Sequence, residues 1–345
     1  MERKQMRLNS IQFGFVAALL VSMASTSVAQ AADAPAPTDD SKVIVLRIGT
    51  VAPESSSWGK VFNAWKKAVA AKTNGMVDLK IDYDSKQGDE VAMVGKIRSG
   101  QLQGAAITGN GLSTISKQVL MLQLPGLFPS WAALDVARER IRPRLDQEFD
   151  KAGFKVLGWG DIGEAKLMTK GFKVMKPADL QHKKTFVLQG DAVAPMLFQL
   201  IGDTTPKPLT VFEVLPALQS NSINVINVPA LVAEQLQWAP KLDMINTDTS
   251  GFAIGALVFS ATKFKQLPAN IQKILEETGA ASGVALTKRI REEDAAAFSR
   301  LSKRMTVYSP TDADKALWTA IFEKTRKSLV GSTFNADLYN AMMAK

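Results

Sequence analysis

The sequence predicts an α/β protein of two lobes with mostly parallel sheets, crossing strands between the lobes and one long helix that spans both. From residue 43 onward, apolar segments with strand spacing alternate with segments of helical spacing. Such alternation is typical of a mostly parallel sheet with helices on both faces. The pattern occurs twice, before and after residue 170, which predicts two lobes. A final helical segment, 268–304, would be roughly 55 Å long if unbroken, which exceeds the diameter of a small domain.

The first lobe opens with a β-α-β-α-β pattern. Ligands of such sheets bind beyond the carboxyl ends of the strands, which directs attention to the loops at 52–57 and 108–111. A serine in the first of these loops is positioned to cap the following helix. We expect strands at 43–51, 77–83, 103–108 and 155–157, and helices at 58–75, 89–99, 112–122 and 131–151.

The second set of elements begins after Lys170. The long helix opens with Pro268 near its first turn, and Gly279 and Gly283 leave open whether it bends or breaks. We expect strands at 184–188, 205–209, 223–227 and 255–260, and helices at 177–181, 191–201, 212–219 and 230–238. The expected domains are lobe I, formed by 43–161 with 253–293, and lobe II, formed by 162–252 with 294–345.

The N-terminus has the features of a Sec-type signal peptide. Basic residues precede the short apolar run 13–24, and small residues lead to Ala29-Gln30-Ala31, an A-x-A cleavage site. The alternative is a membrane anchor, but the apolar run is shorter than the roughly 18–20 residues that span a bilayer. We therefore expect a signal peptide at 1–31, a linker at 32–42 and a periplasmic protein.

Composition excludes several classes of function. The chain has no cysteine and one histidine, so thiolate chemistry, zinc–thiolate clusters and multi-histidine metal sites are excluded. The formal net charge is +9, but Lys and Arg are scattered rather than interleaved with aromatic residues. This distribution favours solubility over nucleic-acid binding. We expect no catalytic residues, no metal, no cofactor and no nucleic-acid partner.

One motif resembles a dinucleotide-binding fingerprint. Gly158-Trp159-Gly160-Asp161-Ile162-Gly163 matches G-x-G-x-x-G after a strand. A true fingerprint requires a helix immediately afterwards, whose N-terminus holds the pyrophosphate. The residues from 164 to 172 show no helical face. We therefore interpret 158–163 as a flexible crossover between the lobes and, with the strand region 250–254, as a hinge.

Five segments, in this order and spacing, resemble the periplasmic solute-binding proteins of TRAP transporters, the DctP-type family. The resemblance covers about residues 43 to 330. It implies a two-lobed periplasmic-binding-protein clamp with a lobe-spanning helix. It also implies capture of a solute, usually an organic acid, for delivery to membrane permease subunits. The segments are VLRIGT at 45–50, SSW at 56–58, QGDE at 87–90, PKPL at 206–209 and FEVLPALQ at 212–219.

The departures from the family pattern concern ligand carboxylates. The family's arginine in the strand after the D-L-K-G turn aligns with Phe186, and a second arginine in the crossover strand aligns with Ala165. Val228 and Val51 stand where polar contacts are usual. The resemblance is closest to a subgroup with an aromatic residue at the arginine position, of which some members work with a TPR-repeat periplasmic protein. These departures favour an apolar or amphipathic ligand over a C4-dicarboxylate, because an unpaired buried anion is costly.

We therefore expect a cleft between the lobes with two aromatic stacking surfaces, Trp159 and Phe186, and two polar anchors, Thr108 and Gln189. Alternatives are an ordinary organic-acid receptor, with Lys166 replacing the arginine, and a periplasmic ligand sensor. An enzyme is a more distant alternative, because no nucleophile–base pair is visible. The expected ligand-binding residues are Val51, Thr108, Trp159, Ala165, Phe186, Gln189, Val211 and Val228.

Overall fold

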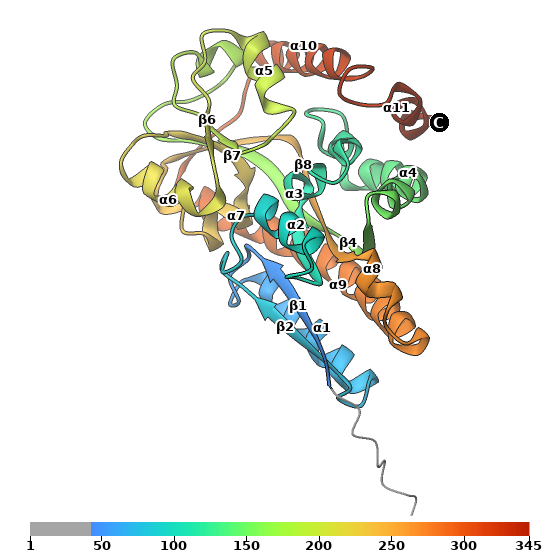
Figure 1. Ribbon diagram of the computed structural model, residues 1–345. Helices are drawn as coiled ribbons and strands as arrows, with labels where there is room; N and C mark the ends of the chain where they lie inside the picture. The colour runs from blue at the N-terminus through green and yellow to red at the C-terminus, as the bar shows by residue number, and fades with distance from the viewer. Residues whose placement is uncertain (1–42, 345) are drawn as a thin grey trace, which may run out of the picture. The chain divides into compact units, whose positions relative to one another are not determined.

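The computed structural model describes residues 43–344, and Figure 1 shows the arrangement of their helices and strands. The expected signal peptide and linker lie outside the described residues. The main sheet has the strand order β2-β1-β3-β8-β4-β7, with β9 paired to β8, and a second small sheet contains β5 and β6. The predicted alternation of strands and helices is confirmed throughout this part of the chain.

The first lobe follows the predicted order closely. Both neighbours of β1 are parallel to it. Capping residues start the helices here: the side chain of Ser56 accepts a hydrogen bond from the backbone N–H of Gly59, and Asp89 accepts one from Ala92. These elements are β1 (Ile44–Thr50), α1 (Ser57–Lys72), β2 (Val77–Asp82), α2 (Glu90–Arg98), β3 (Gly104–Thr108), α3 (Gly109–Ser113), η1 (Lys117–Gln123) and α4 (Trp131–Lys151). The single helix expected at 112–122 is therefore wrong, because Ser116 caps a separate 3-10 helix.

Two long antiparallel strands cross the molecule. They are β4 (Phe154–Thr169) and β8 (Met244–Ser260), and they make the sheet mixed rather than mostly parallel. The short strands expected at 155–157 and 255–260 are wrong in length. Glycines and polar residues interrupt the apolar runs, so periodicity shows only one end of each strand. The segments expected as hinges pair with each other, with register shifts: Asp161 lies opposite Ile254, and Gly163 opposite Ala253.

Helix α9 (Ala269–Ser302) is unbroken and packs directly on β4. A Cβ atom added to Gly158 would lie 2.4 Å from the carbonyl oxygen of Gly279. A Cβ added to Gly283 would lie 2.3 Å from the carbonyl oxygen of Trp159. Real Cβ atoms do not approach this closely, so the glycines are required for the close approach of helix and strand. Gly279 and Gly283 therefore do not break the helix, and Gly158 of the G-x-G-x-x-G segment packs against α9.

The remaining elements follow β4 along the chain, up to the C-terminal helix α11. Helix α11 packs on α4, and its Leu338 and Met342 belong to the same apolar cluster as Ile141 and Leu145. The lobe boundaries given above stay a prediction. The elements are η2 (Pro177–Leu180), β5 (Phe186–Leu188), α5 (Ala194–Ile201), β6 (Lys207–Leu209), α6 (Val211–Gln219), β7 (Val225–Pro229), α7 (Ala230–Gln235), η3 (Ala239–Lys241), α8 (Ala261–Lys265), β9 (Thr306–Tyr308), α10 (Asp312–Leu329) and α11 (Ala336–Met343).

Candidate ligand-binding site

A cavity of about 1020 Å³ lies where the crossing strands meet the ends of β1, β3 and β7 and the helices α5 and α10. This volume is at the upper end of the range usual for small-molecule sites. Seven of the eight residues predicted to bind ligand line it: Val51, Thr108, Trp159, Ala165, Phe186, Val211 and Val228. The eighth, Gln189, lies in a small adjacent groove. The structure thus brings the seven together, and their contact with a ligand stays a prediction.

Aromatic side chains form much of the cavity wall. Phe186 is 7% exposed and packs edge-to-face on Trp238, with 5.9 Å between ring centroids. Trp131 and Phe252 form a second pair, with centroids 4.4 Å apart. All four residues line the cavity. The wall around Phe186 is therefore an apolar surface.

Trp159 has a different orientation from that expected of a stacking surface. Its ring meets the edge of Phe149 on α4 at 6.1 Å. Burial raises the pKa of Asp146 on the same helix, and the neighbouring indole N–H of Trp159 opposes that rise. The edge-to-face contact with Phe149 therefore covers part of the indole and leaves only the rest of its surface to the cavity.

The charged side chains in the wall are mostly acidic. Glu90, Glu164, Asp191 and Asp248 line the cavity, and Lys315 on α10 is the one cation among its described lining residues. No arginine lines the cavity in the described part of the chain. Among residues 43–344, His, Cys, Asp and Glu side chains form no cluster of three or more that could hold a metal ion.

Glu90 is 4% exposed and is held entirely by neutral donors. Its carboxylate accepts hydrogen bonds from the backbone N–H and the hydroxyl of Thr108, both at 2.7 Å, and from the N–H of Gly111 at 3.0 Å. Burial raises the pKa of Glu90, and these hydrogen bonds only partly oppose the rise. Because the Thr108 hydroxyl already donates to Glu90, it can accept a hydrogen bond from a ligand but cannot donate one.

Gln189 contributes its backbone to a contact between the loop after β5 and helix α3. Its carbonyl oxygen accepts a hydrogen bond from Nδ2 of Asn110 at 2.9 Å, and its N–H donates to the carbonyl of Leu209 at 3.0 Å. The first bond joins helix α3, which directly follows β3, to the loop after β5. In this conformation Gln189 therefore closes the edge of the site, whereas it was expected to be a polar anchor within it.

Lys166, the alternative to the missing arginine, does not line the cavity. Its ammonium donates to the carbonyl of Thr247 at 2.9 Å and to the hydroxyl of Thr249 at 2.7 Å, and it lies 3.4 Å from the carboxylate of Glu164. Its Nζ also lies 5.0 Å from the ring centroid of Phe298. These contacts tie Lys166 to β8 and to Glu164, so its ammonium is already paired within the protein.

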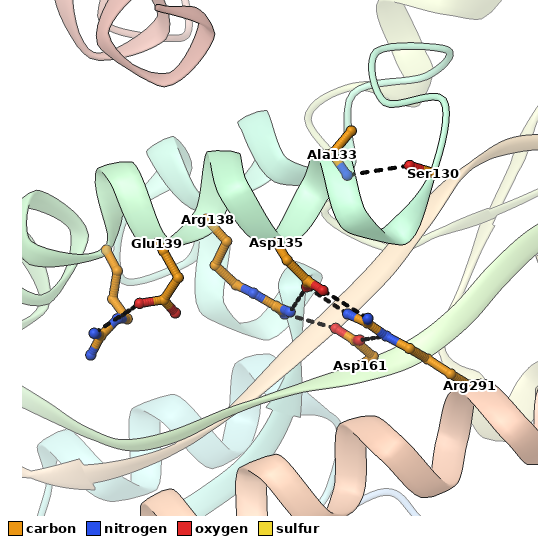
Figure 2. A network of polar contacts seen from close by, with 8 residues as sticks. Ser130, Ala133, Asp135, Arg138, Glu139, Asp161 and Arg291 are labelled. Carbon is orange, nitrogen blue, oxygen red and sulfur yellow. Dashed lines mark hydrogen bonds and ion pairs between the residues drawn. The ribbon is translucent and has the colours of Figure 1, made fainter. Parts of the chain in front are cut away.

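A buried ion network supports one wall (Figure 2). The fully buried carboxylate of Asp161 on β4 accepts hydrogen bonds from Arg138 on α4 and Arg291 on α9, each at 2.7 Å. Asp135 pairs with both arginines at 2.6 Å. Arg291 also lies over the ring of Trp131, 4.4 Å from its centroid. The network therefore fixes an aromatic residue of the cavity wall to the crossing strand and the long helix.

The sequence analysis missed several wall residues. Trp131 and Asp191 follow recognisable signals, since Ser130 caps α4 and Asp191 accepts hydrogen bonds from the first turn of α5. Phe252 lies in the part of β8 that periodicity did not reveal. Lys315 and Trp318 lie on α10, for which no site role was expected. Among these missed residues, only Trp131 and Asp191 could have been located from the sequence, through the helix-capping signals at Ser130 and Asp191.

The family model for bacterial extracellular solute-binding protein family 7, DctP, matches residues 48–331. The chain belongs to this family. The 2,3-diketo-L-gulonate-binding periplasmic protein YiaO of Escherichia coli K12 is 22% identical over 340 residues, covering 98% of this chain and 99% of YiaO. A solute-binding protein of Sulfitobacter sp. NAS-14.1 is 22% identical over 307 residues, covering 87% of this chain and 91% of that protein. The predicted DctP-type family is confirmed.

Solved structures share the fold. A TRAP periplasmic solute-binding protein from Sulfurospirillum deleyianum with bound succinate has a TM-score of 0.81 at 17% identity, covering 88% of this chain and 99% of that one. A similar protein from Roseobacter denitrificans with bound L-galactonate has a TM-score of 0.79 at 18% identity, covering 87% and 99%. The predicted two-lobed α/β clamp is confirmed.

Within residues 43–344, no helix combines the length and apolar composition needed to cross a membrane.

Proposed function

We propose that this chain is the solute-binding protein of a TRAP transporter, which captures a small organic ligand between its lobes and delivers it to membrane permease subunits. Family membership over residues 48–331 and the cavity at the crossing strands support this role. The compartment would be the periplasm, reached through the signal peptide expected at 1–31. The protein would act by binding and release, without catalysis.

The ligand of this site would be apolar or amphipathic. The observation that carries this proposal is the wall at Phe186, where a ring packed on Trp238 stands at the position of the family's arginine. Ala165 at the second arginine position also lines the cavity. Burying apolar ligand surface here would contribute about 25 cal/mol per Å². These features support membership of the subgroup that lacks the carboxylate-binding arginine.

An ordinary organic-acid receptor is the second candidate. The related solved structures contain bound acids, among them succinate and L-galactonate. In this chain, Lys315 is the lining cation that could receive an acid, and it lies 3.7 Å from the carboxylate of Asp248.

A TPR-repeat periplasmic partner is implied by the resemblance alone, and pull-down from periplasmic extract would test it.

Two measurements test the ligand class. Native mass spectrometry of the purified protein should show a retained apolar or amphipathic molecule. Calorimetric titration of the delipidated protein should show affinity that rises with alkyl chain length, with a negative heat-capacity change. Micromolar binding of succinate or malate, with no response to the alkyl series, would instead establish the organic-acid receptor.

A further inference from the structure

The charges around the cavity are not balanced. Of its four carboxyl groups, Glu164 has Lys166 at 3.4 Å and Asp248 has Lys315 at 3.7 Å. Within residues 43–344, neither Glu90 nor Asp191 has a cation at ion-pair distance. Burial raises the pKa of Glu90 and of Asp191, as expected of buried carboxyl groups whose negative charge is not balanced by a nearby cation of the protein.

The hydrogen bonds of Asp191 leave one of its oxygens free. Its Oδ1 accepts from the backbone N–H groups of Val193 at 2.7 Å and Ala194 at 3.1 Å, at the start of α5. Among the described residues, Oδ2 has no hydrogen-bond partner. Since Asp191 lines the cavity, this oxygen is an unused acceptor in its wall.

Further unused polar atoms lie in the same wall. Oδ1 of Asn110 is buried and has no partner in the described part of the chain, while Nδ2 of Asn110 donates to Gln189, two residues before Asp191. The hydroxyl of Thr185 also lacks a partner among these residues, although Thr185 is 2% exposed and lines the cavity. Asn110 lies two residues after Thr108, which donates to Glu90. The end of the cavity near Asn110 and Asp191 therefore has two acceptor oxygens without a partner among the described residues, and the Thr185 hydroxyl is a further unpartnered group of the wall that can donate or accept.

We propose that this end of the cavity receives a hydrogen-bond-donating head group without negative charge, so that the ligand is an amphipathic amine. The inference rests on the apolar ligand proposed above and adds the chemistry of its polar end. A primary ammonium supplies three donors and a positive charge, which match the free Asp191 oxygen, the Asn110 carbonyl and the uncompensated Glu90. A ligand carboxylate would instead meet acceptors and like charge.

Three probes with one alkyl chain test the proposal: n-octylamine, n-octanol and n-octanoate, titrated into delipidated protein at neutral pH below their aggregation limits. We expect octylamine to bind more tightly than octanoate by about tenfold or more, with octanol between them. Octanoate binding as tightly as octylamine would overturn the head-group assignment while supporting the apolar ligand. Binding of none of the three would contradict the apolar ligand itself, and this inference with it.

Asp191→Asn is the matching variant, because asparagine keeps the capping oxygen and removes only the charge. We expect octylamine affinity to fall by about fivefold or more and octanol affinity to change by less than about twofold. The control is Asp179→Asn, since Asp179 also accepts backbone hydrogen bonds at a helix start but does not line the cavity. Equal octylamine affinity in Asp191→Asn and the unmodified protein would overturn the role of Asp191.

Discussion

Asp161 lies wholly inside the protein, and its Oδ2 accepts a hydrogen bond from Nε of Arg291 at 2.7 Å. The pair joins the crossing strand β4 to the long helix α9. A buried charge of this kind depends on its partners, since breaking such a pair leaves an uncompensated charge in a medium of low polarity.

Asp161→Asn should therefore destabilise the protein strongly. The change leaves Arg138 and Arg291 with Asp135 as their one shared carboxylate among the described residues and removes the buried charge between them, which costs about 3–5 kcal/mol of the free energy of unfolding. Urea denaturation followed by tryptophan fluorescence measures this. The control is Glu139→Gln, which removes an exposed ion pair with Arg142, for an expected loss of about 0–1 kcal/mol. Similar losses in the two variants would contradict the structural role of the network.

Gly158→Ala tests the close packing of α9 on β4. The added methyl group would meet the carbonyl oxygen of Gly279 at 2.4 Å, so helix and strand must separate. We expect a loss of about 1–3 kcal/mol of stability, as in other overpacked sites. Gly95→Ala on α2 is the control, because nothing lies within 4 Å of its added Cβ and alanine favours a helix. Unchanged stability of Gly158→Ala would show that this approach is looser than described.

Phe186→Ala should weaken binding of an alkyl ligand by about 1–3 kcal/mol, roughly 5- to 150-fold. The same change removes the contact with Trp238, so it should also lower the free energy of unfolding by about 3–5 kcal/mol. Phe186→Leu retains most of the apolar volume and separates the two effects. Calorimetry at a temperature where all variants are folded measures the affinity. An unaffected affinity in Phe186→Ala would remove this residue from the site.

Ligand binding should bring the lobes together, because a clamp gains contacts from both sides only when closed. Small-angle scattering should show a smaller radius of gyration when the ligand is present. Asn110→Ala removes the hydrogen bond to the Gln189 carbonyl and should favour the open form. A radius that does not respond to saturating ligand would count against closure.

The signal peptide predicts a defined processing product. Expressed with its own N-terminus in a Gram-negative host, the protein should appear in the periplasmic fraction without residues 1–31. Intact-mass spectrometry of that fraction measures the cleavage point. Recovery from the cytoplasm with Met1 retained would contradict the prediction.

The sequence predicted elements well where local signals act alone. Helix α4 has its predicted bounds because Ser130 caps it and its apolar face is regular. The full lengths of β4 and β8 escaped prediction, because their pairing depends on contacts across the sheet rather than on local apolar spacing. Of the eight ligand-binding residues expected from the resemblance, seven line the cavity. The capping signal of Asp191 was overlooked, whereas Lys315 could not be placed there, since only the folded arrangement brings α10 to the cavity.

The packing of α11 on α4 has a consequence for the order of folding. Leu338 and Met342 complete an apolar cluster with residues almost two hundred positions earlier, and Arg140 donates to the carbonyl of Met342 at 2.9 Å. Contacts of such sequence separation form late and slowly. The apolar face of α4 that α11 covers therefore stays exposed until the last residues have been made. A shortened chain that ends before α11 would keep this face exposed to chaperones and proteases.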